Sequence, residues 1–226
     1  MTLDAIIFDL DGTLVDTELL WAAAMSAYLA DQRCYCPKET MLRIVYGRSW
    51  NDIYRDITAR FPTLSKPSHV MADQLRAYYL RLRDSSDGVV IHSSAALLKT
   101  LAADYPVIIV SGSPRADVEE AVQLLRVTPQ VRFVLGAEDY SPGKPSPAGF
   151  LLGAQRLGVS PSNCLVFEDS QAGVKAAKAA GMWCVALARD TAHPQDLSAA
   201  DWVLSDLADF SVEAFQRHRA ASWPNM

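Results

Sequence analysis

The sequence has few cysteines, no cluster of basic residues and no long apolar run. Its four cysteines, Cys34, Cys36, Cys164 and Cys184, are too few for the disulfide framework of a secreted protein of 226 residues. We therefore expect reduced thiols and a cytoplasmic location. No apolar stretch approaches the roughly 18 residues of a membrane-spanning helix, and the first residues, MTLDAIIFD, lack the basic segment of a signal peptide.

Charge and composition exclude further classes of partner. The net charge is −5 and no stripe of Lys and Arg is present, which argues against binding to nucleic acid or to an anionic membrane. Hydrophobic residues make up 50% of the chain and charged residues 21%, as in an ordinary globular protein. The length suits one large domain, or a core domain with a smaller second one.

Six short apolar runs are predicted to be β-strands. Most are apolar throughout rather than alternating, which is typical of strands buried on both faces and hence of a parallel sheet. Helical patterns between them predict a doubly wound α/β fold. One helix is expected after Ser113 as cap and Pro114 as first helical residue. The predicted strands are residues 4–9, 106–111, 131–135, 164–169, 183–188 and 201–205.

Residues 17–88 interrupt this strand–helix rhythm. They contain no convincing strand but have helical patterns in LLWAAAMSAYLA, WNDIYRDITARF and HVMADQLRAYYLRLRD. We therefore predict an α/β core domain made of residues 1–16 and 89–226, with an α-helical cap domain inserted at residues 17–88. The tail HRAASWPNM is expected to be frayed.

Polar residues stand where the predicted strands end. Asp9 closes the first strand and Ser111 the second, Glu168 and Asp169 close the fourth, and Lys144 follows the third. In an open parallel sheet, ligands bind beyond the carboxyl ends of the strands. With Asp11, this edge offers four carboxylates, one hydroxyl and one ammonium group. That set suits a phosphate group bound with Mg²⁺, which prefers oxygen ligands.

Four motifs carry a resemblance to a known family. FDLDGTLVDTE, VSGSP, GKPSP and VFEDSQAG, in this order, resemble the motifs of the haloacid dehalogenase-like (HAD) hydrolases. The helical insertion resembles the cap of the β-phosphoglucomutase and phosphoglycolate-phosphatase branch. The resemblance implies a Mg²⁺-dependent phosphatase that hydrolyses a sugar phosphate or similar small phosphomonoester through an aspartyl-phosphate. We expect a monomer or a weak homodimer.

The resemblance also implies a role for each motif residue. Asp9 is the expected nucleophile, and Asp11 the general acid and base, whose backbone carbonyl also binds the metal. Asp169 is expected to bind the metal directly, and Glu168 to bind it through water or to orient the site. Lys144 is expected to bridge the phosphate and Asp9. Phosphate binding is assigned to Leu10, Gly12, Thr13, Ser111 and the Gly112 backbone.

Cap residues are less constrained by pattern. Trp21 and Arg48 are the ones we assign to substrate binding, with Trp50 as a further candidate, although aromatic residues of a helical cap also suit its core. Asp16 fits the start of a helix as well as it fits a site.

Other chemistries fit the motifs less well. Receiver domains also combine acidic residues, a hydroxyl and a lysine, but they are shorter, lack a cap and place their acidic pair before the phosphorylated aspartate. Haloacid dehalogenases lack the second acid, which is Asp11 here. Phosphonatases use a cap lysine, and Lys38 and Lys66 both stand beside prolines. Cys34 and Cys36 lack two further ligands with the spacing of a zinc site.

A mutase is the alternative to a phosphatase. The mutase resemblance brings a histidine five residues after the acid that begins the cap, and Trp21 stands there. It also brings an arginine three residues after a cap glycine. After Gly47 the chain reads Arg48-Ser49-Trp50, so Trp50 takes that place, and Arg48 or Arg76 would have to substitute. Both departures favour hydrolysis.

Overall fold

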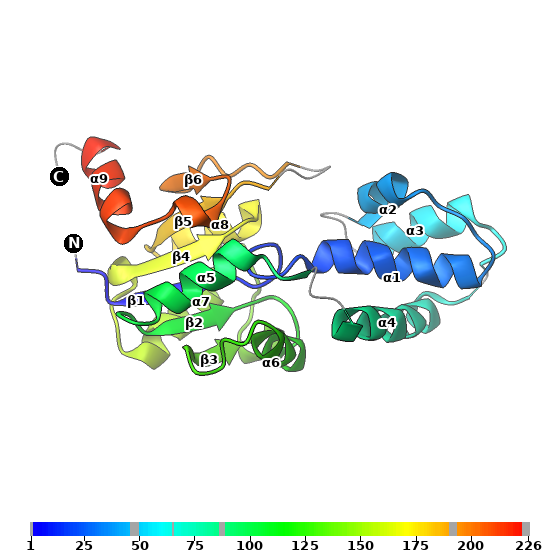
Figure 1. The fold of residues 1–226 in the computed structure, drawn as a ribbon, viewed down its shortest axis with the longest axis horizontal. Helices are drawn as coiled ribbons and strands as arrows, with labels where there is room; N and C mark the ends of the chain where they lie inside the picture. Colours follow the sequence, from blue (N-terminus) through cyan, green and yellow to red (C-terminus); the bar gives the residue numbers. More distant parts are fainter. Residues whose placement is uncertain (1, 46–49, 65, 86–88, 190–193, 223–226) are drawn as a thin grey trace. The chain divides into compact units, whose positions relative to one another are not determined.

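The computed structural model describes residues 2–45, 50–64, 66–85, 89–189 and 194–222 (Figure 1). Strands and helices alternate along most of the chain, but in the described residues five consecutive α-helices lie between the first strand and the second. The strands are β1 (Ala5–Phe8), β2 (Val107–Val110), β3 (Val131–Leu135), β4 (Cys164–Glu168), β5 (Trp183–Leu187) and β6 (Trp202–Leu204). The α-helices are α1 (Thr17–Asp31), α2 (Lys38–Val45), α3 (Trp50–Arg60), α4 (Ser68–Ser85), α5 (His92–Leu101), α6 (Arg115–Leu124), α7 (Ala148–Leu157), α8 (Gln171–Ala179) and α9 (Val212–Ser222). Short 3₁₀ turns are η2 (Ala137–Asp139), η3 (Pro161–Asn163) and η4 (Leu207–Asp209).

The six strands form one parallel sheet in the order β3-β2-β1-β4-β5-β6. All four residues of β1 and of β2 are buried, as expected for strands that have helices on both sides. The predicted α/β fold class, with all six strands and a helical cap, is confirmed. Because β1 and β4 are neighbours at the centre, their carboxyl ends bring Asp9 and Asp169 to one edge of the sheet.

Two hydrophobic cores lie on the two faces of this sheet. Ile6 and Phe8 of β1 pack into the core under α5, α6 and α9, and Ile7 packs into the opposite core under α7 and α8. Each fully buried aliphatic or aromatic side chain of this kind stabilises the fold by about 1.5–3 kcal/mol. The two cores fix the sheet from both sides, so the loops at its edge start from rigid positions.

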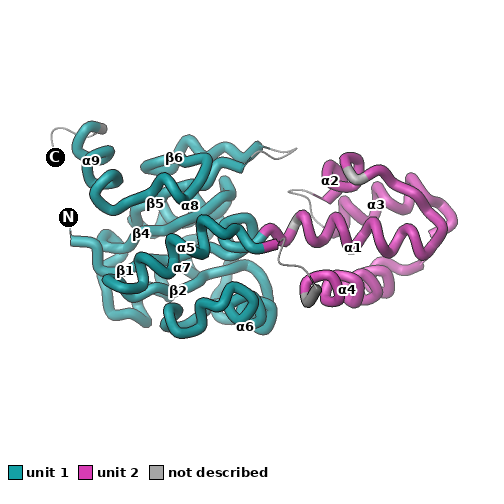
Figure 2. Tube along the Cα trace, viewed as in Figure 1, with its two compact units in different colours: residues 1–15, 90–189, 194–226 teal, residues 16–89, 190–193 magenta. Residues whose placement is uncertain are grey.

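A second compact unit comprises Asp16–Val89 and contains α1 to α4 (Figure 2). It has its own core, in which Tyr28, Met41 and Ile57 are buried. The carboxylate of Asp16 accepts a hydrogen bond from the backbone N–H of Leu19 at 3.0 Å, so Asp16 is the N-cap of α1.

In the described part of the chain, no helix is both long and apolar enough to cross a membrane.

Two local predictions are wrong. Ser113 does not cap α6: Pro114 is the N-cap, the helix starts at Arg115, and the Ser113 hydroxyl donates to Asp11 instead. The tail that was expected to be frayed is helical over residues 218–222, because α9 continues to Ser222 and His218 stacks on Trp202 with ring centroids 5.0 Å apart; residues 223–226 lie outside the described residues. In both cases a tertiary contact overrides the local pattern. Helix α2, which the sequence did not predict, packs within the core of the second unit.

Candidate active site

The loop after β1 is a tight turn that requires glycine. The Leu10 carbonyl accepts from the backbone N–H groups of Leu14 at 2.8 Å and Val15 at 3.1 Å, and Gly12 N–H donates to the Val15 carbonyl at 2.7 Å. Gly12 has a φ of +87°, which other residues rarely adopt. A side chain at Gly12 would also overlap the Asp169 carboxylate. Glycine therefore lets the loop pass close to the acidic end of β4.

Lys144 joins two carboxylates of the site. Its ammonium group forms an ion pair with Asp9 Oδ1 and another, at 2.6 Å, with Glu168 Oε1. Burial by itself would lower the pKa of Lys144, but the carboxylates of Asp9 and Glu168 raise it above its ordinary value. The ammonium group therefore stays charged, and it orients both carboxylates.

Glu168 is held on both of its oxygens. Its Oε2 accepts from the backbone N–H of Asp169 at 2.9 Å and from the N–H and hydroxyl of Ser170 at 2.8 and 2.9 Å. The Ser170 hydroxyl in turn accepts from Gly173 N–H at 3.0 Å and so caps α8. A side chain at Gly173 would overlap the Glu168 carboxylate. This buried glutamate thus links the end of β4 to the start of α8.

Three carboxylates gather where a cation could bind. One oxygen each from Asp9, Glu168 and Asp169 lies within 4.8 Å of the other two. Burial raises the pKa of Asp9 to about 8, against the opposite effect of Lys144, and burial together with Asp9 raises the pKa of Asp169 well above its ordinary value. If all three carboxylates were ionised, they would carry two more negative charges than the Lys144 ammonium group offsets, so a bound cation would favour their ionised forms. The acidic cluster expected at this edge of the sheet is confirmed for Asp9, Glu168 and Asp169, and its oxygen-only donor set fits a hard divalent cation.

Two serine hydroxyls hold the second aspartate of the loop. Ser111 Oγ and Ser113 Oγ both donate to Asp11 Oδ2, at 2.8 and 2.7 Å. Ser111 is buried at the end of β2, and its Oγ also accepts from Ser113 N–H at 2.9 Å. The chain places these three side chains together although about one hundred residues separate Asp11 from the serines. Asp11 is therefore held beside the expected phosphate-binding residue.

Tyr140 and Arg189 were not predicted to belong to this region. The Tyr140 hydroxyl donates to the Ser111 carbonyl at 2.8 Å, and burial raises the pKa of Tyr140. Arg189, in the segment after β5, donates to the Gly12 carbonyl at 3.1 Å. Neither residue stands in a motif, and both act on backbone carbonyl groups. Their position after strands β3 and β5 was the only signal for them in the sequence.

The remaining predicted residues are distributed as follows. Buried Thr13 donates to Asp169 Oδ1 at 3.3 Å, the Leu10 side chain is buried in a core, and Gly112 is exposed with open space around it. Trp21 lies in α1, within the second unit. Arg48 lies outside the described residues. The thiols of Cys34 and Cys36 are buried and belong to no metal-ligating group among the residues that the structure describes.

The profile of the haloacid dehalogenase-like hydrolase family matches residues 6–187 of the chain. The chain belongs to this family. The resemblance seen in the four motifs is thereby confirmed. In this chain, the matched region includes the loop after β1, the end of β2, Lys144 and the end of β4. The site described above is built from these matched segments.

Individual relatives cover almost the whole chain. Validoxylamine A 7'-phosphate phosphatase of Streptomyces hygroscopicus subsp. limoneus is 34% identical over 208 residues, which are 90% of this chain and 93% of the relative. Hexitol phosphatase A of Escherichia coli is 31% identical over 208 residues, covering 91% and 92%. A crystal structure of β-phosphoglucomutase from Clostridium difficile covers 100% of both chains with a TM-score of 0.72 and 22% identity, which shows the fold.

Proposed function

We propose that this HAD hydrolase cleaves a sugar phosphate or a similar small phosphomonoester through an aspartyl-phosphate on Asp9, with Mg²⁺ as cofactor. One observation carries the proposal. Asp9, paired with Lys144, lies with Glu168 and Asp169 in one acidic cluster, and the loop after β1 also presents Asp11 to Ser111. Phosphoryl transfer needs a nucleophile, a positive charge that offsets the phosphate, a proton-transfer group and a hydroxyl that binds the phosphate, and these residues provide them.

The enzyme class has direct support. Family membership makes the chain a hydrolase, and relatives that cover nine tenths of it are phosphatases of small phosphorylated molecules. The chain is accordingly a phosphoric monoester hydrolase. Which phosphomonoester it takes is left open by these relatives, since their substrates differ.

In the first half of the reaction, an Asp9 carboxylate oxygen attacks phosphorus and the bond from phosphorus to the ester oxygen breaks. Lys144, held at Asp9 Oδ1, keeps the carboxylate oriented and offsets negative charge on the phosphoryl oxygens. Asp11 gives its proton to the departing oxygen, so the product leaves as an alcohol. The Ser111 hydroxyl and the Gly112 N–H donate to phosphoryl oxygens.

In the second half, water attacks phosphorus and the Asp9–phosphorus bond breaks. Asp11, now ionised, accepts the proton of that water, which returns both aspartates to their starting states. The Ser111 and Ser113 hydroxyls keep Asp11 next to the phosphoryl position throughout. Inorganic phosphate is the second product.

Asp9 and Asp169 are the residues we assign to direct metal binding, together with the Asp11 carbonyl. Glu168 already uses both oxygens, on Lys144 and on the start of α8, so we assign it to orienting the site. Bound there, Mg²⁺ supplies positive charge that offsets repulsion between the carboxylates and the phosphate group.

Mutase activity is less well supported. A phosphosugar mutase that matches this cap would need a proton-relaying group at Trp21, and an indole has a single N–H donor and no acceptor. Trp21 stacks on Tyr79 with ring centroids 4.2 Å apart. Trp50, at the place of the expected arginine, donates its N–H to Ser68 at 2.9 Å. These contacts support hydrolysis.

Phosphate release from p-nitrophenyl phosphate tests the metal assignment. We expect activity with Mg²⁺, loss of it in excess EDTA and recovery on adding Mg²⁺ back, with Ca²⁺ inhibiting because it takes more ligands at longer distances. Asp169→Asn should raise the Mg²⁺ requirement more than tenfold, while Asp209→Asn, at an exposed aspartate in η4, should leave it unchanged. Full activity in EDTA would contradict the proposal.

A further inference from the structure

The peptide group between Ser111 and Gly112 lies at the end of β2, where the Ser111 side chain contacts Asp11. Its carbonyl oxygen, which belongs to Ser111, accepts a hydrogen bond from the Tyr140 hydroxyl at 2.8 Å. Because this peptide bond is planar and trans, its N–H, which belongs to Gly112, points in the opposite direction from the carbonyl. A hydrogen bond to the oxygen therefore fixes the direction of the N–H as well.

The neighbouring N–H groups of this loop are already used. Ser111 N–H donates to the Leu135 carbonyl at 3.0 Å, and Ser113 N–H donates to Ser111 Oγ at 2.9 Å. Among the residues that the structure describes, none accepts a hydrogen bond from Gly112 N–H, and Gly112 is exposed with open space around it. The Gly112 N–H is thus a donor of this loop that remains available to a phosphoryl oxygen.

Tyr140 is held in place from two sides. It follows η2, whose first N–H, that of Ala137, donates to the Ser113 carbonyl at 2.9 Å. Its ring lies against Gly149 of α7, where an added Cβ would come within 2.7 Å of the ring. Burial raises the pKa of Tyr140, so the hydroxyl keeps its proton and acts as a donor. The Ser111 carbonyl therefore has a rigid partner.

We propose that Tyr140 is a positioning residue: by holding the Ser111 carbonyl, its hydroxyl keeps the Gly112 N–H aimed at a phosphoryl oxygen. This rests on the proposed function, which assigns the Gly112 N–H to that oxygen. Glycine has more backbone freedom than any other residue, so the direction of this N–H needs an external restraint. Hydrogen bonds in a chain also polarise one another, which makes the N–H a stronger donor.

Tyr140→Phe removes one oxygen atom and keeps the ring against Gly149. We expect kcat for p-nitrophenyl phosphate to fall about tenfold, because a donor fixed in advance stabilises the charge that develops in the transition state. Tyr105→Phe is the matched control. Tyr105 is also partly buried in the core of the sheet, but it precedes β2 and so lies at the opposite end of that strand from Ser111. This variant should leave kcat unchanged.

Gly149→Ala disturbs the same hydrogen bond in a second way. The added methyl group overlaps the Tyr140 ring and displaces its hydroxyl from the Ser111 carbonyl, so kcat should fall here too. Combined with Tyr140→Phe, it should cause little further loss, because both changes remove one interaction. Losses that multiply in the double variant would contradict the proposal.

An NMR signal reports on the N–H directly. Labelling with ¹⁵N-glycine restricts the spectrum to the 11 glycines of the chain, and Gly112→Ala identifies the signal of Gly112. We expect saturating inorganic phosphate with Mg²⁺ to move the wild-type Gly112 proton signal downfield. Tyr140→Phe should at least halve this shift, and Tyr105→Phe should retain it. A role of Tyr140 in packing alone would leave the shift as it is in the wild type.

The two proposals fail in different ways. Unchanged kcat in Tyr140→Phe, or an unchanged phosphate-induced shift of Gly112, would overturn the role of Tyr140 and leave the phosphatase function standing. No phosphate release by the wild-type protein with Mg²⁺ would contradict the phosphatase function, and the Gly112 signal would still decide whether Tyr140 positions that N–H.

Discussion

The Ser111 hydroxyl has one hydrogen, and two groups compete for it. It donates to Asp11 Oδ2 in the structure, and in the proposed reaction it donates to a phosphoryl oxygen. When Ser111 turns to the phosphate, the Ser113 hydroxyl still holds Asp11 at 2.7 Å. In the proposed reaction, we therefore expect Ser113 to position Asp11 once substrate is bound.

We expect Ser113→Ala to lower kcat about tenfold with little change in KM, because Asp11 loses its remaining hydrogen bond at the moment of proton transfer. Steady-state kinetics with p-nitrophenyl phosphate measure both constants. Ser113→Thr should recover most of kcat, and Ser160→Ala, at an exposed serine, is the control. A rise in KM with unchanged kcat would show that Ser113 acts in substrate binding rather than on Asp11.

At this scale the sequence predicts the residues of the motifs and misses their neighbours. Asp9, Ser111 and Lys144 could be found because strand ends in a parallel sheet meet at one edge. Ser113 was interpreted as a helix cap, since a serine before proline suits that role, and its real partner is about one hundred residues away. Tyr140 was missed because its contact depends on how loops fold back onto the sheet edge.

The start of helix α6 is fixed by the short turn η2. The first N–H of the helix, that of Arg115, donates to Glu138 Oε2 at 2.9 Å, and the Arg115 guanidinium pairs with Asp139. Asp139 also accepts from Gly136 N–H at 2.8 Å. These bonds tie α6, which follows Ser111 and Ser113, to the end of β3. One N–H of this helix terminus is therefore already used by a side chain of the protein.

Asp139→Asn should lower the free energy of unfolding by about 1 kcal/mol at pH 7, a small value for a charged hydrogen bond because Arg115 is partly exposed. The hydrogen bond from Arg115 holds the pKa of Asp139 below its ordinary value of 3.8. The difference between wild type and variant should thus be fully present above that value and vanish as pH falls through the lower, folded-state pKa.

Urea unfolding at several pH values measures this difference. Asp104→Asn, at an exposed aspartate after α5, is the control and should show no such pH dependence. A difference between wild type and Asp139→Asn that persists unchanged at pH 2 would show that the charge of Asp139 is not its cause.

Strands were easier to predict than helices. A strand buried on both faces is apolar throughout, so β1, β2 and β4 stand out from their surroundings. Helix α2 has only eight residues and half of them are polar, so its period is hard to see in the sequence. It forms because Met41 and Ile44 enter the core of the second unit. That stabilisation comes from tertiary packing.

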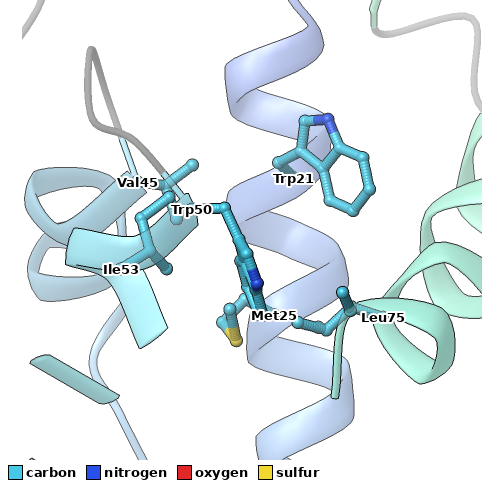
Figure 3. A pocket seen from close by; sticks show the side chains of 7 residues that line it. Trp21, Met25, Val45, Trp50, Ile53 and Leu75 are labelled. Atoms are coloured by element: carbon cyan, nitrogen blue, oxygen red, sulfur yellow. The ribbon is translucent and has the colours of Figure 1, made fainter. Parts of the chain in front are cut away.

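At the scale of the whole molecule, the choice between phosphatase and mutase depends on which side chains the second unit, the helical cap, provides. This unit contains an apolar cavity that is lined in part by Trp21 and Trp50 (Figure 3), where a mutase of this branch is expected to have a histidine and an arginine. We expect a hexose 1-phosphate, if it is turned over, to give free phosphate and hexose. Coupled assays for phosphate and for hexose 6-phosphate distinguish the products. Hexose 6-phosphate forming faster than phosphate would establish the mutase.

Trapping the covalent intermediate is the most direct test of the central claim, that Asp9 carries the phosphoryl group. Borohydride reduces an aspartyl-phosphate to homoserine, so the protein is quenched during turnover of p-nitrophenyl phosphate with Mg²⁺, reduced, digested and analysed by mass spectrometry. We expect homoserine at position 9, dependent on substrate and absent from Asp9→Asn, which should itself be folded and inactive. Substrate-dependent homoserine at Asp11 or Asp169, or turnover by Asp9→Asn at the wild-type rate, would contradict the assignment.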